Sequence, residues 1–191
     1  IVMQALIKKS GLDIKNDFKL QYVATPVDAM QMLILRRVDH ALLAEPAISI
    51  ALRKTGSFPV KLIAPDLYRS INLQEEWGRL YKIEAKIPQA GLAIIGDTNG
   101  KEELISKVLA EYDKSLAWYK NNKEEASKLV VKTLPMLEEK GLADSIEYVR
   151  FENISAIKSK KDLEFFFDIL MQNDSKLIGG KLPNEDFYYK W

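Results

Sequence analysis

The hydrophobic pattern changes its period within residues 27–54, VDAMQMLILRRVDHALLAEPAISIALRK. Apolar residues at helical spacing come first, and residues 41–44 then form a short continuous apolar run. Such a run is typical of a strand that is covered on both faces by helices. Glu45 and Pro46 end the run, and Pro46 suits the first turn of a following helix. The pattern therefore predicts a helix, a buried strand, a sharp turn and a second helix.

The flanking sequence extends this alternation of helices and strands. Helices are predicted over residues 1–9, with Gly11 as the stop, and over residues 73–81. Further strands are predicted over residues 18–24, 60–63 and 87–95. The last of these, IPQAGLAII, contains small residues, which indicate that a backbone or a ligand comes close. Alternating elements of this kind predict an α/β fold with ligand bound at the carboxyl ends of its strands.

The second half of the chain is predicted to be mainly helical. The expected helices end near residue 121, span residues 123–133, run from Pro135 to Gly141, and span residues 162–171. Residues 149–157 fit neither period. The tail, residues 179–191, ends in four aromatic side chains and is expected to dock on a core. The aromatic residues of the tail are Phe187, Tyr188, Tyr189 and Trp191.

Composition narrows the class of protein. A chain of 191 residues that is 47% hydrophobic can form one large domain or two small lobes. Its formal net charge of +1 gives no reason to expect a nucleic acid or an anionic membrane as partner. With no cysteine and one histidine, the segment has no thiolate chemistry, disulfide or Cys/His zinc site. No stretch reaches the roughly 20 apolar residues of a spanning helix.

The opening of the chain is expected to lie in the interior of a longer protein. It begins at Ile1 with neither an initiator methionine nor a signal peptide. Its first helix has no strand before it, although a helix followed by a strand is normally the crossover of a βαβ unit. An upstream strand is therefore expected to be missing. A missing lobe would expose apolar surface and favour association.

Few residues are candidates for chemistry. GDTNGK at residues 96–101 is one residue short of a phosphate-binding loop, and Glu102 stands where serine or threonine should hold the metal, so a turn is predicted. His40 is expected to be a structural, hydrogen-bonded histidine, because metal sites need several ligands. Trp77 and Tyr81 share a helical face and are expected in the core.

Two polar residues are open to two interpretations each. Glu45 either caps the helix that follows it or faces a cleft. Gln89 either hydrogen-bonds a neighbouring backbone or reaches a ligand from the strand of small residues.

The sequence around residues 27–54 resembles that of the periplasmic solute-binding proteins of ABC transporters that serve nitrate, sulfonate, taurine, bicarbonate and thiamine-precursor uptake. The resemblance rests on VDHALLAEP between two helices, on IPQAGLAII and on the closing PNEDFYYKW. Family members usually show Gly-x-x-Asp-Ala before the strand, whereas residues 36–40 here are RRVDH. The resemblance spans essentially the whole chain, and it is specific for the superfamily rather than for a ligand.

The resemblance implies a type II periplasmic-binding-protein fold with two lobes and a hinge. Residues 1–86 would form the second α/β lobe, residues 87–95 the hinge strand, and residues 96–191 a helical part that packs on a first lobe encoded upstream. The ligand-binding positions would be Thr25, Glu45, Pro46 and Gln89. The acidic Glu45 favours an amine or heterocycle donor at that corner over a simple anion.

The function that the resemblance implies is capture of a small polar organic or anionic nutrient between two lobes and its delivery to an ABC permease. No catalyst, cofactor or metal is expected. The protein would be periplasmic or a lipoprotein at the bacterial cell surface, in contact with the membrane only through the permease or an upstream lipid anchor. The alternatives are an enzyme on the same fold, in thiamine-pyrimidine or menaquinone-precursor synthesis, and the effector-binding domain of a regulator.

Overall fold

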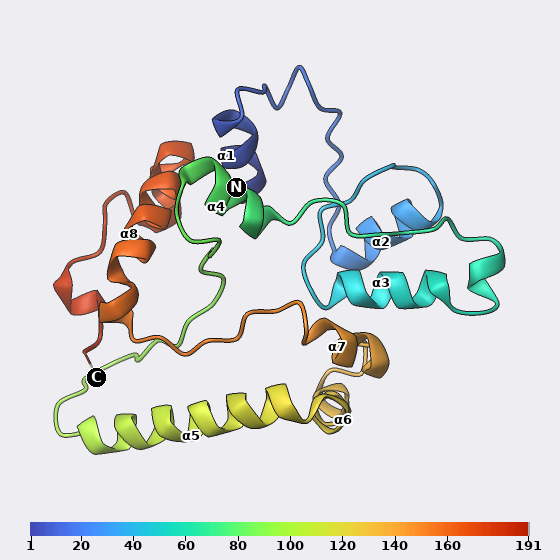
Figure 1. Ribbon diagram of the computed structural model, residues 1–191. Helices are drawn as coiled ribbons and strands as arrows, with labels where there is room; N and C mark the ends of the chain where they lie inside the picture. The colour runs from blue at the N-terminus through green and yellow to red at the C-terminus, as the bar shows by residue number, and fades with distance from the viewer. Residues whose placement is uncertain (191) are drawn as a thin grey trace. The chain divides into compact units, whose positions relative to one another are not determined.

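The structure, a computed structural model, describes residues 1–190, and over these residues the chain is helical (Figure 1). Helix accounts for 54% of the chain, and the described residues contain no strand. The α-helices are α1 (Val2–Lys9), α2 (Pro26–Ile34), α3 (Ala47–Gly56), α4 (Leu73–Tyr81), α5 (Glu102–Asn121), α6 (Lys123–Thr133), α7 (Glu139–Ser145) and α8 (Ala156–Asn173). Short 3-10 helices are η1 (Val60–Leu62), η2 (Ser175–Ile178) and η3 (Glu185–Phe187).

The predicted α/β fold of the type II periplasmic-binding class is therefore wrong. Residues 18–24, 41–44 and 87–95 are irregular segments, and most of the predicted strand at residues 60–63 is η1. A short apolar run is compatible with a strand, but a strand exists only where a second strand completes its hydrogen bonds. Within residues 1–190 none of these segments has such a partner.

The helices follow the local signals in the sequence closely. α1 ends at Lys9, and Gly11 has the positive φ of 77° that suits a glycine after a helix. α4 spans Leu73–Tyr81 as predicted, with the Asn72 side chain accepting a hydrogen bond from the backbone N–H of Gln74. α6 also has its predicted bounds, and α5 ends at Asn121.

Two helices differ from their predicted bounds. α7 begins at Glu139 rather than at Pro135, because the Glu138 carboxylate caps it by accepting from the N–H groups of Lys140 and Gly141. α7 also continues beyond Gly141 to Ser145. α8 is longer than predicted at both ends, and its first residues lie in the stretch that the periodicity left ambiguous.

The chain divides into two compact units, and each combines segments from distant parts of the sequence. Unit 1 comprises residues 1–20, 71–106 and 153–191, and unit 2 comprises residues 21–70 and 107–152. Helix α5 begins in unit 1 and continues in unit 2. The predicted lobe boundaries at residues 86 and 95 stay a prediction.

The core of unit 1 forms where α1, α4 and α8 supply apolar side chains, and its centre is Trp77. This indole is 1% exposed and its ring centroid lies 4.6 Å from that of Tyr81. The prediction that both aromatic residues serve the core is confirmed for Trp77. The residues packed with Trp77 in this core are Ala5, Leu6, Ile87 and Ile169, with Val2, Leu73, Leu80, Tyr81, Phe165 and Phe166 at its margin.

The tail of the chain docks on unit 1, as predicted, over the part that the structure describes. Tyr188 is 1% exposed, and the Lys160 ammonium lies 5.1 Å from the centroid of its ring. Lys160 also pairs with Glu185 of η3, and this pairing lowers the pKa of the Glu185 carboxyl. Trp191 lies outside the described residues.

The core of unit 2 is smaller and joins α2 to α3. Met30, Ile50 and Ala51 are buried, with Ile34, Leu43 and Leu137 packed around them. α7 packs on α3 at Gly141, where the absence of a side chain lets the backbone approach Ile50. α7 also packs on α6. Unit 2 therefore depends on α3, which contacts helices on both sides of it in the sequence.

We expect Thr25→Ala to lower the free energy of unfolding of unit 2 by about 1 kcal/mol, because it removes the N-cap of α2. The Thr25 hydroxyl accepts from the N–H of Asp28 at 3.2 Å, and the Asp28 carboxylate accepts from the N–H of Thr25 at 3.0 Å. Chemical denaturation followed by far-ultraviolet circular dichroism measures the effect. Thr25→Ser should retain stability and Gln31→Ala, on the exposed face of α2, should have little effect; equal stability of Thr25→Ala and the wild type would contradict the assignment.

Candidate ligand-binding site

Glu45 lies in the turn that precedes α3, and its carboxylate is almost completely buried. One oxygen, Oε2, accepts a hydrogen bond from the backbone N–H of Ser49 at 3.1 Å. The Glu45 side chain is only 9% exposed. The interpretation of Glu45 as a helix cap is therefore confirmed, since a carboxylate bonded to a first-turn N–H also suits the positive end of the helix dipole.

Arg69 binds the second oxygen of the same carboxylate. Its Nη2 donates to Glu45 Oε1 at 2.6 Å and to the hydroxyl of Ser49 at 2.8 Å. Ser49 is 3% exposed, whereas the Arg69 side chain is 32% exposed. The guanidinium therefore reaches from solvent into a polar recess that α3 supplies, and each of its two contacts there is charge-assisted.

Tyr148 covers the guanidinium from one side. The Arg69 guanidinium carbon lies 3.5 Å from the centroid of the Tyr148 ring, a stacked cation–π arrangement. Tyr148 itself is 55% exposed. Stacking on the ring, together with the two hydrogen bonds of Nη2, restricts the orientation of the arginine before any ligand binds.

The arrangement leaves part of the guanidinium open to a ligand. Among residues 1–190, Arg69 Nε and Nη1 donate to no protein group, whereas both oxygens of Glu45 are occupied. The exposed donor is therefore the arginine, and Glu45 is not free to receive an amine. A planar edge of N–H groups matches the geometry of an oxyanion such as a carboxylate or a sulfonate.

The other predicted ligand positions do not join this cluster. Pro46 is the N-cap of α3 and is half-buried beside Glu45. Thr25 is exposed, and its hydroxyl is used by the N-cap of α2. Gln89 belongs to unit 1, in the irregular segment after Ile87, and is exposed. Their roles in ligand binding stay predictions.

His40 does not have its expected structural role. It lies in the irregular segment between α2 and α3, is exposed, and makes no hydrogen bond within residues 1–190. The reason is that the strand predicted to begin there is absent. The described residues also contain no group of three or more acidic, histidine or cysteine side chains placed to hold a metal ion.

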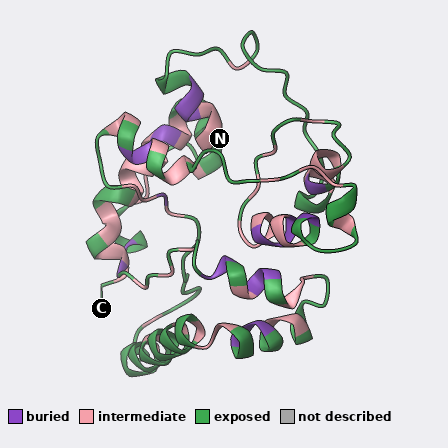
Figure 2. Ribbon diagram, turned by 45° about the vertical axis from the view of Figure 1, so that its right-hand side comes forward, coloured by how far each residue is buried: buried purple, intermediate pink, exposed green. Residues whose placement is uncertain are grey.

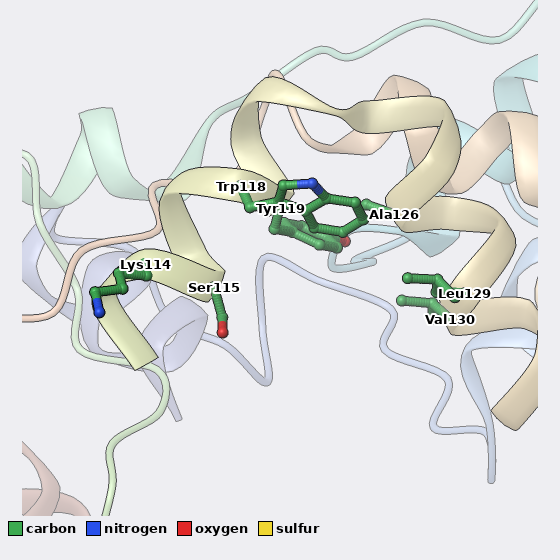
Figure 3. Close-up of a pocket in the computed structure, with 7 residues that line it drawn as sticks. All are labelled: Lys114, Ser115, Trp118, Tyr119, Ala126, Leu129 and Val130. Carbon is green, nitrogen blue, oxygen red and sulfur yellow. The ribbon is translucent and has the colours of Figure 1, made fainter. Parts of the chain in front are cut away.

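A second, apolar feature lies in unit 2 between the end of α5 and α6. It is an open groove of about 510 Å³ lined by Lys114, Ser115, Trp118, Tyr119, Ala126, Leu129 and Val130 (Figure 3). Burial raises the pKa of the Tyr119 phenol, so this group is a neutral hydrogen-bond donor at neutral pH. None of the four predicted ligand positions lines the groove.

Sequence reasoning identified Glu45 and missed the residues that complete its cluster. Arg69 lies 24 residues from Glu45 in an irregular segment, and Tyr148 follows α7. Neither belongs to a periodic pattern or a motif. No signal in the sequence singles out Arg69, which lies between the predicted strand at residues 60–63 and the predicted helix at residues 73–81.

Comparison with known proteins adds no relative. No family model, no curated protein and no solved structure matches this chain. Within residues 1–190, none of the helices has the length and apolar character needed to cross a membrane.

Proposed function

We propose that this chain is the solute-binding component of an ABC importer, which captures a small polar organic or anionic nutrient and passes it to a permease. The observation that carries the proposal is the cluster of Glu45, Ser49, Arg69 and Tyr148. It contains a buried carboxylate, that of Glu45, at a position where the resemblance implies ligand contact, and a guanidinium that is held by hydrogen bonds and a stacked ring.

The chemistry of the cluster suits reversible binding better than catalysis. A guanidinium has N–H donors and no acceptor atom, so Arg69 offers no general base. Glu45 is held by two hydrogen bonds, and the hydroxyl of the adjoining Ser49 accepts from Arg69. A guanidinium that is stacked on a ring and paired with a buried carboxylate is suited to hold an anionic solute.

The remaining support comes from the sequence. VDHALLAEP, which carries Glu45 and Pro46, resembles the corresponding stretch of the importer proteins. This reasoning also places the protein in the periplasm or at the cell surface, with the permease as its partner. The proposal does not require the sheet that was expected, because the groups of the cluster come from a helix, two turns and an irregular segment of unit 2.

The test is native mass spectrometry of the full-length protein purified from its own cells without refolding. We expect an intact nutrient to travel with the wild type. Added taurine, an alkanesulfonate, nitrate, bicarbonate and an aminopyrimidine then identify the class by thermal shift and titration calorimetry. Arg69→Ala should bind the identified solute at least about tenfold more weakly, because a charge-assisted hydrogen bond is lost.

Arg79→Ala is the matched control, since Arg79 also pairs with a carboxylate, that of Glu76, but lies in unit 1 on an exposed face. Its affinity for the solute should equal that of the wild type. Arg69→Lys keeps the charge and loses the planar edge, so it should bind weakly as well. Equal affinity of Arg69→Ala and Arg79→Ala, or conversion of a solute into a product, would overturn the proposal.

A further inference from the structure

Three large apolar side chains are strongly exposed on the turn that follows α3. Phe58 is 81% exposed, Leu62 is 74% exposed and Ile63 is 82% exposed. All three lie on η1 or directly beside it, and Figure 2 shows this turn mainly in the colour of exposed residues. These three residues are called the apolar tip below. A contiguous exposed apolar surface of this kind marks a site of association with a membrane or with another protein.

The apolar tip does not contribute to the core of unit 2. The core residues that α3 supplies are Ile50 and Ala51, in the first half of that helix. The tip follows the opposite end of α3, and η1 packs on this helix (Figure 1). The side chains of the tip can therefore leave water for a partner without disturbing the core.

The charges beside the apolar tip are basic. Residues 46–65 contain three basic residues and no acidic residue. One of the three, Arg53, is paired with Asp144, whereas Lys54 and Lys61 are exposed and form no ion pair within residues 1–190. The net charge of +1 of the whole chain, which gives no reason to expect an anionic membrane, therefore does not describe this segment.

We infer that the apolar tip inserts into the surface of a membrane that contains anionic lipids, with Lys54 and Lys61 at the level of the headgroups. The inference is independent of the proposed function. Apolar side chains gain free energy when they enter the acyl boundary, and each lysine beside them adds attraction to anionic lipids. Asp66, the next acidic residue of the chain, is repelled by anionic headgroups, so the inserted segment ends before it.

The size of the apolar tip favours a membrane over a protein partner. Three side chains of this kind expose roughly a few hundred Å² at most, whereas each partner of a standard protein–protein interface contributes about 800 Å². Insertion into a bilayer needs no complementary surface, only apolar area and basic neighbours. Lys54 and Lys61 suit this position, because a lysine places its apolar stem along the apolar surface and its ammonium group among the headgroups.

Co-sedimentation of the full chain with lipid vesicles tests the inference. We expect the wild type to bind vesicles of equal parts of phosphatidylcholine and phosphatidylglycerol, and to bind phosphatidylcholine vesicles more weakly. Leu62→Ser and Ile63→Ser should each lower the partition into the mixed vesicles by about tenfold. Met136→Ser is the matched control, since Met136 lies in the same unit, is 78% exposed and is followed by Glu138 and Glu139. It should bind like the wild type.

A charge variant tests the role of the lysines. Lys61→Gln should lower binding to the mixed vesicles by about fivefold and should hardly change binding to phosphatidylcholine vesicles. Lys140→Gln, which changes an exposed lysine elsewhere in unit 2, should have no effect on either. Added salt should weaken binding of the wild type more than binding of Lys61→Gln. Equal effects of Lys61→Gln and Lys140→Gln would overturn the inference.

A fluorophore attached to Ile63→Cys reports insertion directly, because the chain has no cysteine of its own. An environment-sensitive label at this position should brighten and shift to shorter wavelength with the mixed vesicles, whereas the same label on Met136→Cys should not change. The inference is overturned if the wild type binds no vesicles, if Leu62→Ser and Met136→Ser bind equally, or if the label on Ile63→Cys does not respond. Loss of self-association in Leu62→Ser without vesicle binding by the wild type would assign the tip to a second copy of the chain instead.

Discussion

Trp77→Ala is expected to lower the free energy of unfolding of unit 1 by about 3–5 kcal/mol. The indole is 1% exposed and lies at the centre of the unit, with ring centroids of Tyr81, Phe165 and Phe166 within 4.6 to 6.0 Å. Removing it takes away the buried apolar area and leaves a cavity that three aromatic rings cannot fill. Since a domain is stable by only about 5–15 kcal/mol, unit 1 should lose much of its structure.

Denaturant unfolding, followed by near-ultraviolet circular dichroism of the aromatic side chains, measures this effect. Trp118→Ala is the comparison, because Trp118 is 41% exposed and lies in the groove rather than in a core. It should change the stability of the chain by well under about 1 kcal/mol, as exposed positions usually do. Trp77→Phe should fall between the two. Equal unfolding midpoints for Trp77→Ala and Trp118→Ala would mean that the core of unit 1 is elsewhere.

The sequence predicts the helices of this chain better than it predicts strands. The bounds of α4 and α6 were predicted to the residue, because capping residues and apolar spacing are local features. The strand predictions were wrong because a strand depends on a distant segment rather than on local features. Residues 41–44 and 87–95 have the apolar content of buried strands, but pairing depends on a partner segment, and no local pattern reports whether one exists.

The candidate site shows the same division between local and distant information. The cap was one of the two interpretations that the sequence left open for Glu45, since its position before Pro46 and α3 is visible in the sequence, and the hydrogen bond from Ser49 supports it. Arg69 and Tyr148 were not identified, because tertiary structure brings them to Glu45 from irregular segments. Their contribution changes the chemistry. The Glu45 carboxylate, which was expected to receive an amine, is instead paired with Arg69. The group open to a ligand is therefore the Arg69 guanidinium.

The importer proposal rests on the Arg69 cluster and no longer on the expected fold. The sheet and hinge that the resemblance implied are absent from the described residues, so closure of two lobes about a hinge strand no longer supports it. Its support is an ordered arginine, with a buried counter-charge and an aromatic cover, beside the segment that carries the resemblance. Arg69→Ala, compared with Arg79→Ala, tests this support.

Gly141→Ala is expected to destabilise unit 2 by about 2 kcal/mol, although alanine favours a helix over glycine by about 1 kcal/mol. A Cβ at this position would lie 2.7 Å from Ile50 Cγ1, 2.8 Å from Glu138 Oε2 and 2.9 Å from Ile50 Cα. The first two atoms belong to side chains that can move, but moving Glu138 breaks the cap of α7, in which it accepts from the N–H of Gly141.

The decisive contact in that variant is the one with Ile50 Cα, because a backbone atom cannot withdraw unless α7 separates from α3. Ile50→Ala should therefore fail to rescue Gly141→Ala. Gly56→Ala is the matched control within the same unit, since a Cβ there meets nothing within 4 Å, and it should be neutral or stabilising by up to about 1 kcal/mol. Both variants are compared by chemical denaturation. If Gly141→Ala were as stable as Gly56→Ala, the helix propensity of alanine would outweigh the contact, and the close approach of α7 to α3 would be refuted.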